Sequence, residues 1–183
     1  MYLVAGTLSR SVSLILLPLY ARFLDGIEVG AFGIITALIL FLQILTIGGF
    51  DSAAGRWYFH TPGPEERRAA FSTWAFNQLT ISLFFCVLMV VTARPLAAAL
   101  TGDADRFTSA VRLAGCFLVT ATLPNILYNW YRLARRPVAA SLTAVGTAAS
   151  TAGMTLLFIV ILDGGTAGAF AAQIVSGVIM SVL

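Results

Sequence analysis

The chain has 183 residues, of which 59% are apolar and only 10% are charged. Because an ordinary soluble domain carries about 25% charged residues, this composition excludes a soluble globular domain and indicates a membrane protein. The eleven basic residues are all arginines, the net charge is +3, and no run of like charges indicates a nucleic-acid partner.

Six apolar segments are long enough to cross a bilayer, which takes about 20 residues per helix. They are expected at 3–24, 29–50, 70–92, 109–131, 138–162 and 165–183. None shows the regular alternation of polar and apolar residues that marks transmembrane β-strands. We therefore predict an all-α fold, a polytopic membrane bundle of six transmembrane helices that occupies 1–183.

The distribution of arginines predicts the orientation, because cytoplasmic loops are enriched in basic residues. The loops after the second and fourth spans carry six arginines, and the loops on the other side carry four. The N-terminus is thus expected on the cytoplasmic side of the cell membrane. The sequence is still apolar at Leu183, and we expect the six-helix bundle to be truncated there, as a fragment of something longer.

Two charged residues lie inside or directly after a span. Arg10 falls within the first span, where an arginine costs about 2.5–3.5 kcal/mol and commonly marks a functional site; alternatively, its side chain reaches the cytoplasmic headgroups. Asp51 follows the second span. It either binds a coupling cation or proton, or caps the segment that follows.

Polar side chains recur at helical spacing in two spans. The third span carries Thr73, Asn77 and Thr80, and the fourth carries Asn125, Asn129 and Arg132. Residues three and four apart share one face of a helix. The two stripes either line a common polar cavity or bond to each other and hold the two helices together.

Small residues recur at four-residue spacing in the last two spans. The fifth span has Ala140, Ala144, Ala148 and Ala152, and the sixth has Gly164, Gly168, Ala172 and Ser176. Because small residues let helix backbones approach closely in lipid, both sets predict helix–helix seams.

The sequence offers little for an enzyme. His60 is the one histidine, and no cluster of His, Cys and carboxylates has the spacing of metal ligands. A phosphate-binding loop of the G-x-x-x-x-G-K type needs a lysine, and the chain has none. We expect no catalysis, no metal site and no cofactor.

Three stretches, taken together, resemble one family. They are 18–25 (PLYARFLD) running into 28–33 (EVGAFG), 48–53 (GGFDSA) followed by 56–59 (RWYF), and 131–137 (YRLARRP). In their order and layout they are similar to the N-terminal lobe of the polysaccharide-lipid flippases, the Wzx-like oligosaccharide translocases of the multidrug/oligosaccharidyl-lipid/polysaccharide exporter superfamily.

The resemblance implies two six-helix lobes around a cavity that opens alternately to the two membrane faces. The chain supplies one lobe, so the implied partner is a missing C-terminal lobe or a second copy. The implied activity is the movement of a lipid-diphosphate-linked oligosaccharide from the cytoplasmic to the outer leaflet, for the biosynthesis of a cell-surface polysaccharide.

The candidate substrate-binding residues follow from that activity. Arg10 and Arg56 are expected to bind the diphosphate, because a guanidinium binds phosphate through two parallel hydrogen bonds. Asn77, Asn125 and Asn129 are expected to line the sugar path. A cation-coupled multidrug exporter of the same superfamily and a non-transporting membrane assembly subunit remain alternatives.

Overall fold

The computed structural model describes residues 18, 20–48, 50–60 and 63–182. This part of the chain is almost entirely helical and contains no strand. The elements are α2 (Gly26–Ile47), α3 (Phe50–His60), α4 (Pro64–Val91), α5 (Ala93–Thr101), α6 (Ala104–Leu133), α7 (Pro137–Leu156), the π-helical turn η1 (Leu157–Ile161) and α8 (Gly165–Val182). The predicted all-α class is confirmed.

Five helices in the described part are long and apolar enough to cross a membrane: α2, α4, α6, α7 with η1, and α8. The chain is therefore a multi-pass membrane protein. The five helices correspond to the last five predicted spans, whereas the span predicted at 3–24 lies almost wholly outside the described residues. α4 and α6 begin several residues earlier than expected, because their charged first turns are already helical.

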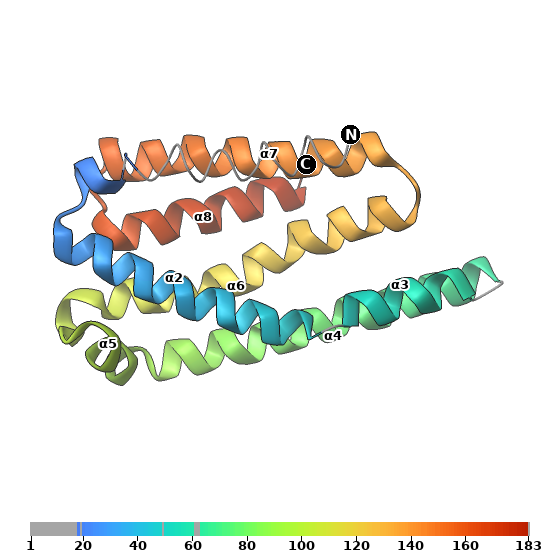
Figure 1. Ribbon diagram of the computed structural model, residues 1–183, viewed down its shortest axis with the longest axis horizontal. Helices are drawn as coiled ribbons and strands as arrows, with labels where there is room; N and C mark the ends of the chain where they lie inside the picture. Colours follow the sequence, from blue (N-terminus) through green and yellow to red (C-terminus); the bar gives the residue numbers. More distant parts are fainter. Residues whose placement is uncertain (1–17, 19, 49, 61–62, 183) are drawn as a thin grey trace.

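The helices form an elongated bundle with α6 near its centre (Figure 1). α6 contacts α2, α4, α5, α7 and α8. At one end of the bundle, α3 and the first turns of α4 extend beyond the other helices as a hairpin. This end, where α6 also finishes and α7 starts, carries Arg56, Arg67, Arg68, Arg132, Arg135 and Arg136. We refer to it as the arginine-rich end.

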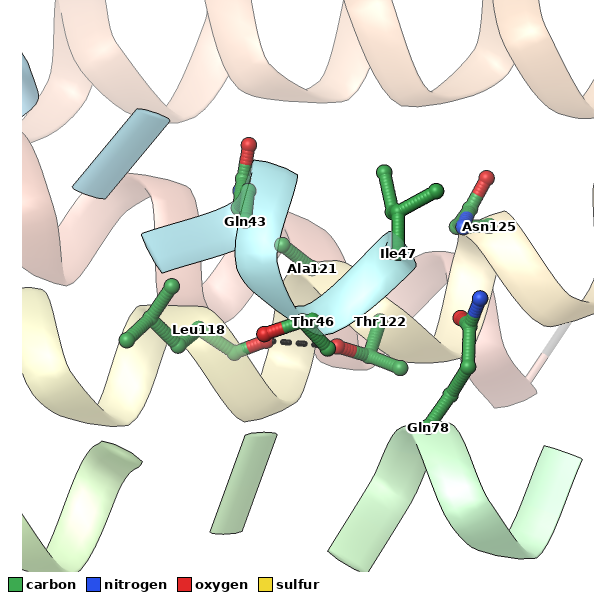
Figure 2. A pocket seen from close by; sticks show the side chains of 8 residues that line it. All are labelled: Gln43, Thr46, Ile47, Gln78, Leu118, Ala121, Thr122 and Asn125. Carbon is green, nitrogen blue, oxygen red and sulfur yellow. Dashed lines mark hydrogen bonds between the residues drawn. The ribbon is translucent and has the colours of Figure 1, made fainter. Parts of the chain in front are cut away.

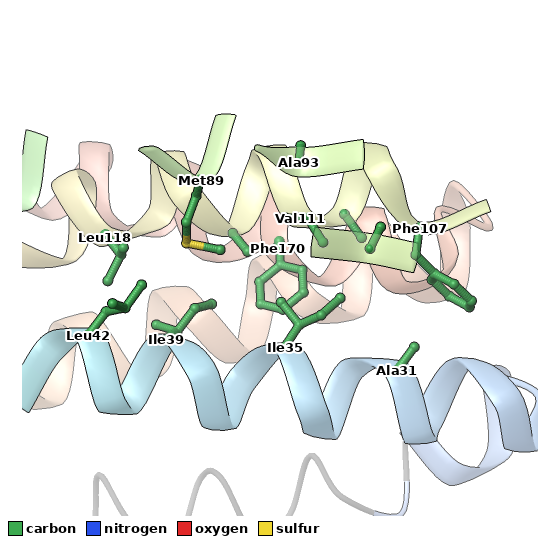
Figure 3. Close-up of a cluster of buried hydrophobic side chains, with 13 residues drawn as sticks. Ala31, Ile35, Ile39, Leu42, Met89, Ala93, Phe107, Val111, Leu118 and Phe170 are labelled. Atoms are coloured by element: carbon green, nitrogen blue, oxygen red, sulfur yellow. The ribbon is translucent and has the colours of Figure 1, made fainter. Parts of the chain in front are cut away.

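A hydrophobic core fills the opposite half of the bundle (Figure 3). Ile35 and Ile39 of α2 face Val111 of α6 and Phe170 of α8, and all four are buried. The remaining surface of α2 stays apolar and exposed, as at Phe41 and Ile44. This exposure is what a helix in contact with lipid requires.

The small-residue seam predicted in the last span is confirmed. Gly168, Ala172 and Ser176 of α8 are buried, and α8 packs closely on α6. The hydroxyl of Ser176 lies 2.6 Å from the hydroxyl of Ser150 and 2.8 Å from that of Thr151, both on α7. α8 is thus fixed to its neighbours by close packing and by interhelical hydrogen bonds.

An ion-pair cluster closes the end of the bundle opposite the arginine-rich end. The Arg106 guanidinium lies 2.7 Å from Asp25 Oδ2 and 3.2 Å from Glu28 Oε1. Asp25 is also the N-cap of α2, where it accepts a hydrogen bond from the backbone N–H of Glu28 at 2.7 Å. That bond first, and Arg106 second, lower the pKa of Asp25 below its ordinary value of 3.8.

Substituting Asp25→Asn tests the charge in this cluster, because asparagine caps a helix as well as aspartate does. Because the pKa of Asp25 is lower in the folded state, its charge stabilises the protein at pH values above the unfolded-state pKa. This stabilisation is lost as the pH falls through the folded-state pKa. We expect the variant to unfold at a slightly lower temperature than the wild type at pH 7, since exposed ion pairs contribute little. The difference should vanish in acid, below both pKa values. Equal unfolding temperatures at pH 7 would contradict this expectation.

Candidate functional site

A polar cavity of about 240 Å³ lies between α2, α4 and α6 (Figure 2). Its lining residues are Gln43, Thr46, Ile47, Gln78, Leu118, Ala121, Thr122 and Asn125. Five of these eight side chains are polar and none is charged. Polar side chains within membrane helices characteristically face the bundle interior or a water-filled cavity. The cavity is therefore the candidate functional site.

The last turns of α2 supply one wall of the cavity. Gln43, Thr46 and Ile47 project from this segment, which ends at Gly48. Gly48 takes the left-handed conformation, with φ of 46°, and its N–H donates to the carbonyl of Ile44. Glycine adopts this conformation without steric cost. The helix therefore stops directly after the residues that line the cavity.

α4 and α6 supply the two facing amides. Gln78 of α4 is only 1% exposed and points toward Asn125 of α6 (Figure 2). Asn129, one turn further along α6, donates from Nδ2 to the Asn125 carbonyl oxygen at 3.0 Å and to Asn125 Oδ1 at 3.2 Å. These bonds hold the Asn125 side-chain oxygen and leave its NH₂ group to donate toward the cavity.

Two threonine hydroxyls complete the polar lining. Thr46 donates to the Leu42 carbonyl and Thr122 donates to the Leu118 carbonyl, both at 2.8 Å. A hydroxyl that donates to its own helix keeps acceptor lone pairs available. The cavity thus presents both amide donors and hydroxyl acceptors, the combination that hydroxyl-rich ligands require.

Pro124 lies within α6, beside Asn125. Proline has no N–H, so the carbonyl of Thr120, four residues earlier, lacks its usual helical donor. Gly177 of α8 packs against this carbonyl: a Cβ atom at Gly177 would lie 2.8 Å from the Thr120 oxygen. The Thr120 carbonyl, which lacks its helical donor, is therefore covered by the backbone of α8.

The structure connects part of the sequence-predicted site to this cavity. Asn125 lines it, and Asn129 is buried directly behind Asn125. Asn77 is half-buried on α4 and is not among the lining residues. Its predicted companions Thr73 and Thr80 are exposed and donate to carbonyls of their own helix. On α4 the cavity is lined by Gln78, one position further along the chain.

The three charged candidates are not connected to the cavity by the described contacts. Arg56 is exposed on α3, where His60 Nδ1 donates to its carbonyl oxygen at 2.9 Å. Asp51 belongs to the first turn of α3, but the structure does not describe its side chain. Arg10 lies outside the described residues. Their roles stay predictions.

Gln43, Thr46, Gln78 and Thr122 were missed by the sequence analysis. Gln43 is the one amide in the interval 29–50, and Thr46 follows three residues later. Residues at this spacing share a helix face. That signal was present in the sequence. The choice between Asn77 and Gln78, in contrast, depends on how α4 is rotated about its axis, which the sequence does not reveal.

The cavity lies closer to the arginine-rich end than to the opposite end. Asn125 is eight residues, or about 12 Å, from the end of α6 at Leu133. At that end Arg67 stacks on Tyr58, 5.8 Å from the ring centroid, and Arg135 stacks on Phe59 at 5.9 Å. Cation–π contacts of this kind fix guanidinium groups against the α3 hairpin.

A comparison of the chain with protein-family models, curated proteins and solved structures finds no match. Within the described residues, no three His, Cys, Asp or Glu side chains gather into a group that could hold a metal ion. What the chain does must therefore follow from the cavity, the charges around it and the sequence motifs.

Proposed function

We propose that the chain is a lobe of a membrane transporter that flips a lipid-diphosphate-linked oligosaccharide across the cytoplasmic membrane. The observation that carries this proposal is a cavity inside a membrane bundle that is lined by three amides, two hydroxyls and three apolar side chains, without a charged group. Sugar hydroxyls both donate and accept hydrogen bonds, and these side chains do the same. The volume of about 240 Å³ is below the roughly 300–1,000 Å³ of typical ligand sites, so a larger glycan requires the cavity to widen.

The charges at the two ends support a substrate that arrives from the cytoplasm. The arginine-rich end holds six arginines against three acidic residues, Asp51, Glu65 and Glu66. The other end holds four arginines against five acidic residues. By the positive-inside rule, the arginine-rich end faces the cytoplasm. A diphosphate approaching from there first meets guanidinium groups, which bind phosphate oxygens in pairs.

The composition of the cavity argues against the cation-coupled exporter. Coupling to a cation through this site would call for a carboxylate, and none of the eight lining residues is acidic. An assembly subunit would use its polar groups for contacts between helices. The side chains of Gln78 and Asn125 also border a cavity, which a subunit that only packs against partner helices does not need, so we favour a transporter.

Reconstituted vesicles test the proposal. The native protein that contains this chain should give a membrane-impermeant quencher access to fluorescent lipid-diphosphate oligosaccharide that began in the inner leaflet. Protein-free vesicles should not. A phospholipid with the same fluorophore should stay in its leaflet, since it lacks the glycan that the cavity binds. No movement of the glycolipid, or equal movement of the phospholipid, would overturn the proposal. Efflux of cationic dyes without glycolipid movement would establish the multidrug exporter instead.

A further inference from the structure

The turn that joins α6 to α7 has an arginine at a position where the backbone favours glycine. Arg135 takes the left-handed conformation, with φ of 55°. Its N–H donates to the Arg132 carbonyl at 3.2 Å, and the N–H of Arg136 donates to the Tyr131 carbonyl at 2.9 Å. These two bonds form the Schellman motif, which usually has glycine at the left-handed position. Because a residue with a Cβ atom is disfavoured there, we expect the Arg135 side chain to have a role of its own.

Two arginines of the arginine-rich end are held beside consecutive residues of α3. The Arg135 guanidinium lies 5.9 Å from the centroid of the Phe59 ring, and that of Arg67 lies 5.8 Å from the centroid of the Tyr58 ring. An arginine that contacts a ring through the face of its guanidinium can still bind phosphate through the N–H groups at the edge. Arg135 and Arg136 are exposed, and neither forms an ion pair with an acidic side chain in the part of the chain that the structure describes.

The length of α6 places this surface at the level of the lipid headgroups. α6 has 30 residues, which is about 45 Å of helix and matches the roughly 40–45 Å of a bilayer with its headgroup regions. Arg132 lies in the last turn of α6, and Arg135 follows directly. On α3, Trp57 is 68% exposed, and tryptophan is enriched at this depth of the membrane. Phosphate groups of lipids therefore lie within reach of these arginines.

We propose that the arginine-rich end binds the anionic phospholipid headgroups of the cytoplasmic leaflet, with Arg135 as a phosphate ligand that Phe59 holds in place. Clusters of about four to eight basic residues directly beside a membrane span are typical of sites for anionic lipids. The opposite end has more acidic than basic residues, and its Arg106 is paired with Asp25 and Glu28. This binding is independent of the glycolipid flipping proposed above, since it requires neither that substrate nor a wider cavity.

Thermal unfolding of the purified native protein in an uncharged detergent tests the choice of lipid. We expect the unfolding temperature to rise as phosphatidylglycerol is added, because a ligand that binds only the folded state stabilises it. Phosphatidylcholine with the same acyl chains should have a much smaller effect, and about 0.5 M NaCl should weaken the effect of phosphatidylglycerol. Equal effects of the two lipids would overturn the proposal. An equal effect of inorganic phosphate would also overturn it, because the site would then bind free phosphate and not a lipid surface.

Two triple variants remove the same charge from the two ends of the bundle. The first combines Arg132→Gln, Arg135→Gln and Arg136→Gln, and the control combines Arg22→Gln, Arg94→Gln and Arg112→Gln, all at exposed positions. The first variant should need roughly tenfold to a hundredfold more phosphatidylglycerol for the same rise in unfolding temperature. The control should respond to the lipid as the wild type does. Equal lipid responses of the two variants would contradict binding at the arginine-rich end.

The single variant Arg135→Gly separates the side chain from the backbone of the turn. Glycine adopts the left-handed conformation without steric cost, so the turn should form at least as well as in the wild type. The variant should nevertheless need about fivefold more phosphatidylglycerol for the same rise in unfolding temperature. A wild-type response to the lipid would show that Arg135 is not a phosphate ligand.

Discussion

Replacing Gln78 and Asn125 together by leucine should reduce glycolipid flipping about tenfold to a hundredfold. The two amides are the amide side chains that α4 and α6 contribute to the cavity. A hydrogen bond lost at a buried site costs about 1–3 kcal/mol, and about 1.4 kcal/mol corresponds to a factor of ten. Leucine keeps a similar volume, so the bundle itself should still form.

The measurement is the rate of flipping in vesicles, together with the thermal unfolding of the same preparation. Asn77→Leu is the informative comparison, because it removes an amide one position away that does not line the cavity. We expect this variant to flip glycolipid within twofold of the wild type. A stable double variant with an unchanged rate would exclude the cavity as the sugar path. A large loss of flipping rate in Asn77→Leu alone would instead support the polar face of Thr73, Asn77 and Thr80 that the sequence predicts.

The location of the five membrane-spanning helices in the described residues could be predicted from the sequence because charge is so costly in hydrocarbon. The shorter helices α3 and α5 were not predicted. The intervals between charges correspond to α2, α4, α6, α7 with η1, and α8. The helix ends were less predictable. The third span was predicted to start at residue 70, yet α4 already begins at Pro64, since a helix can continue into the headgroup region without a change of structure.

The rotation of each helix about its axis could not be predicted, and this explains why only part of the candidate site was predicted from the sequence. In a soluble protein the polar face of a helix marks the outside. In α4 both the lipid-facing and the buried surfaces are apolar, as exposed Phe76 and buried Met89 illustrate, so hydropathy does not define the inward face. The difference between Asn77 and Gln78 is a rotation of about 100°, which only packing against α6 decides.

The second large effect that we expect is a loss of stability when the close contact between α6 and α8 is disturbed. Gly177→Ala would place a methyl group 2.8 Å from the Thr120 carbonyl oxygen and 3.1 Å from its carbon. Because these are backbone atoms, no change of rotamer relieves the clash, and α8 has to move away from α6. Overpacking of this kind costs about 1–3 kcal/mol. We therefore expect a lower unfolding temperature for the variant in detergent.

Gly153→Ala is the matched control, since a Cβ atom at this position of α7 meets nothing within 4 Å. It should raise the unfolding temperature, because alanine favours a helix over glycine by about 1 kcal/mol. The two glycine-to-alanine changes are therefore expected to have opposite signs. A stabilising effect of Gly177→Ala would mean that α6 and α8 do not pack as closely as described.

Pro124 links this contact to the cavity, and a double-variant experiment tests the link. Pro124→Ala supplies the N–H that the Thr120 carbonyl lacks, so this carbonyl should turn back into α6 and away from Gly177. The cost of Gly177→Ala should then be smaller in the Pro124→Ala background than in the wild type. Coupling of this sign is expected for residues that act through one shared group. If the two costs simply add, the close packing at Gly177 does not depend on Pro124, and the proposed link would be wrong.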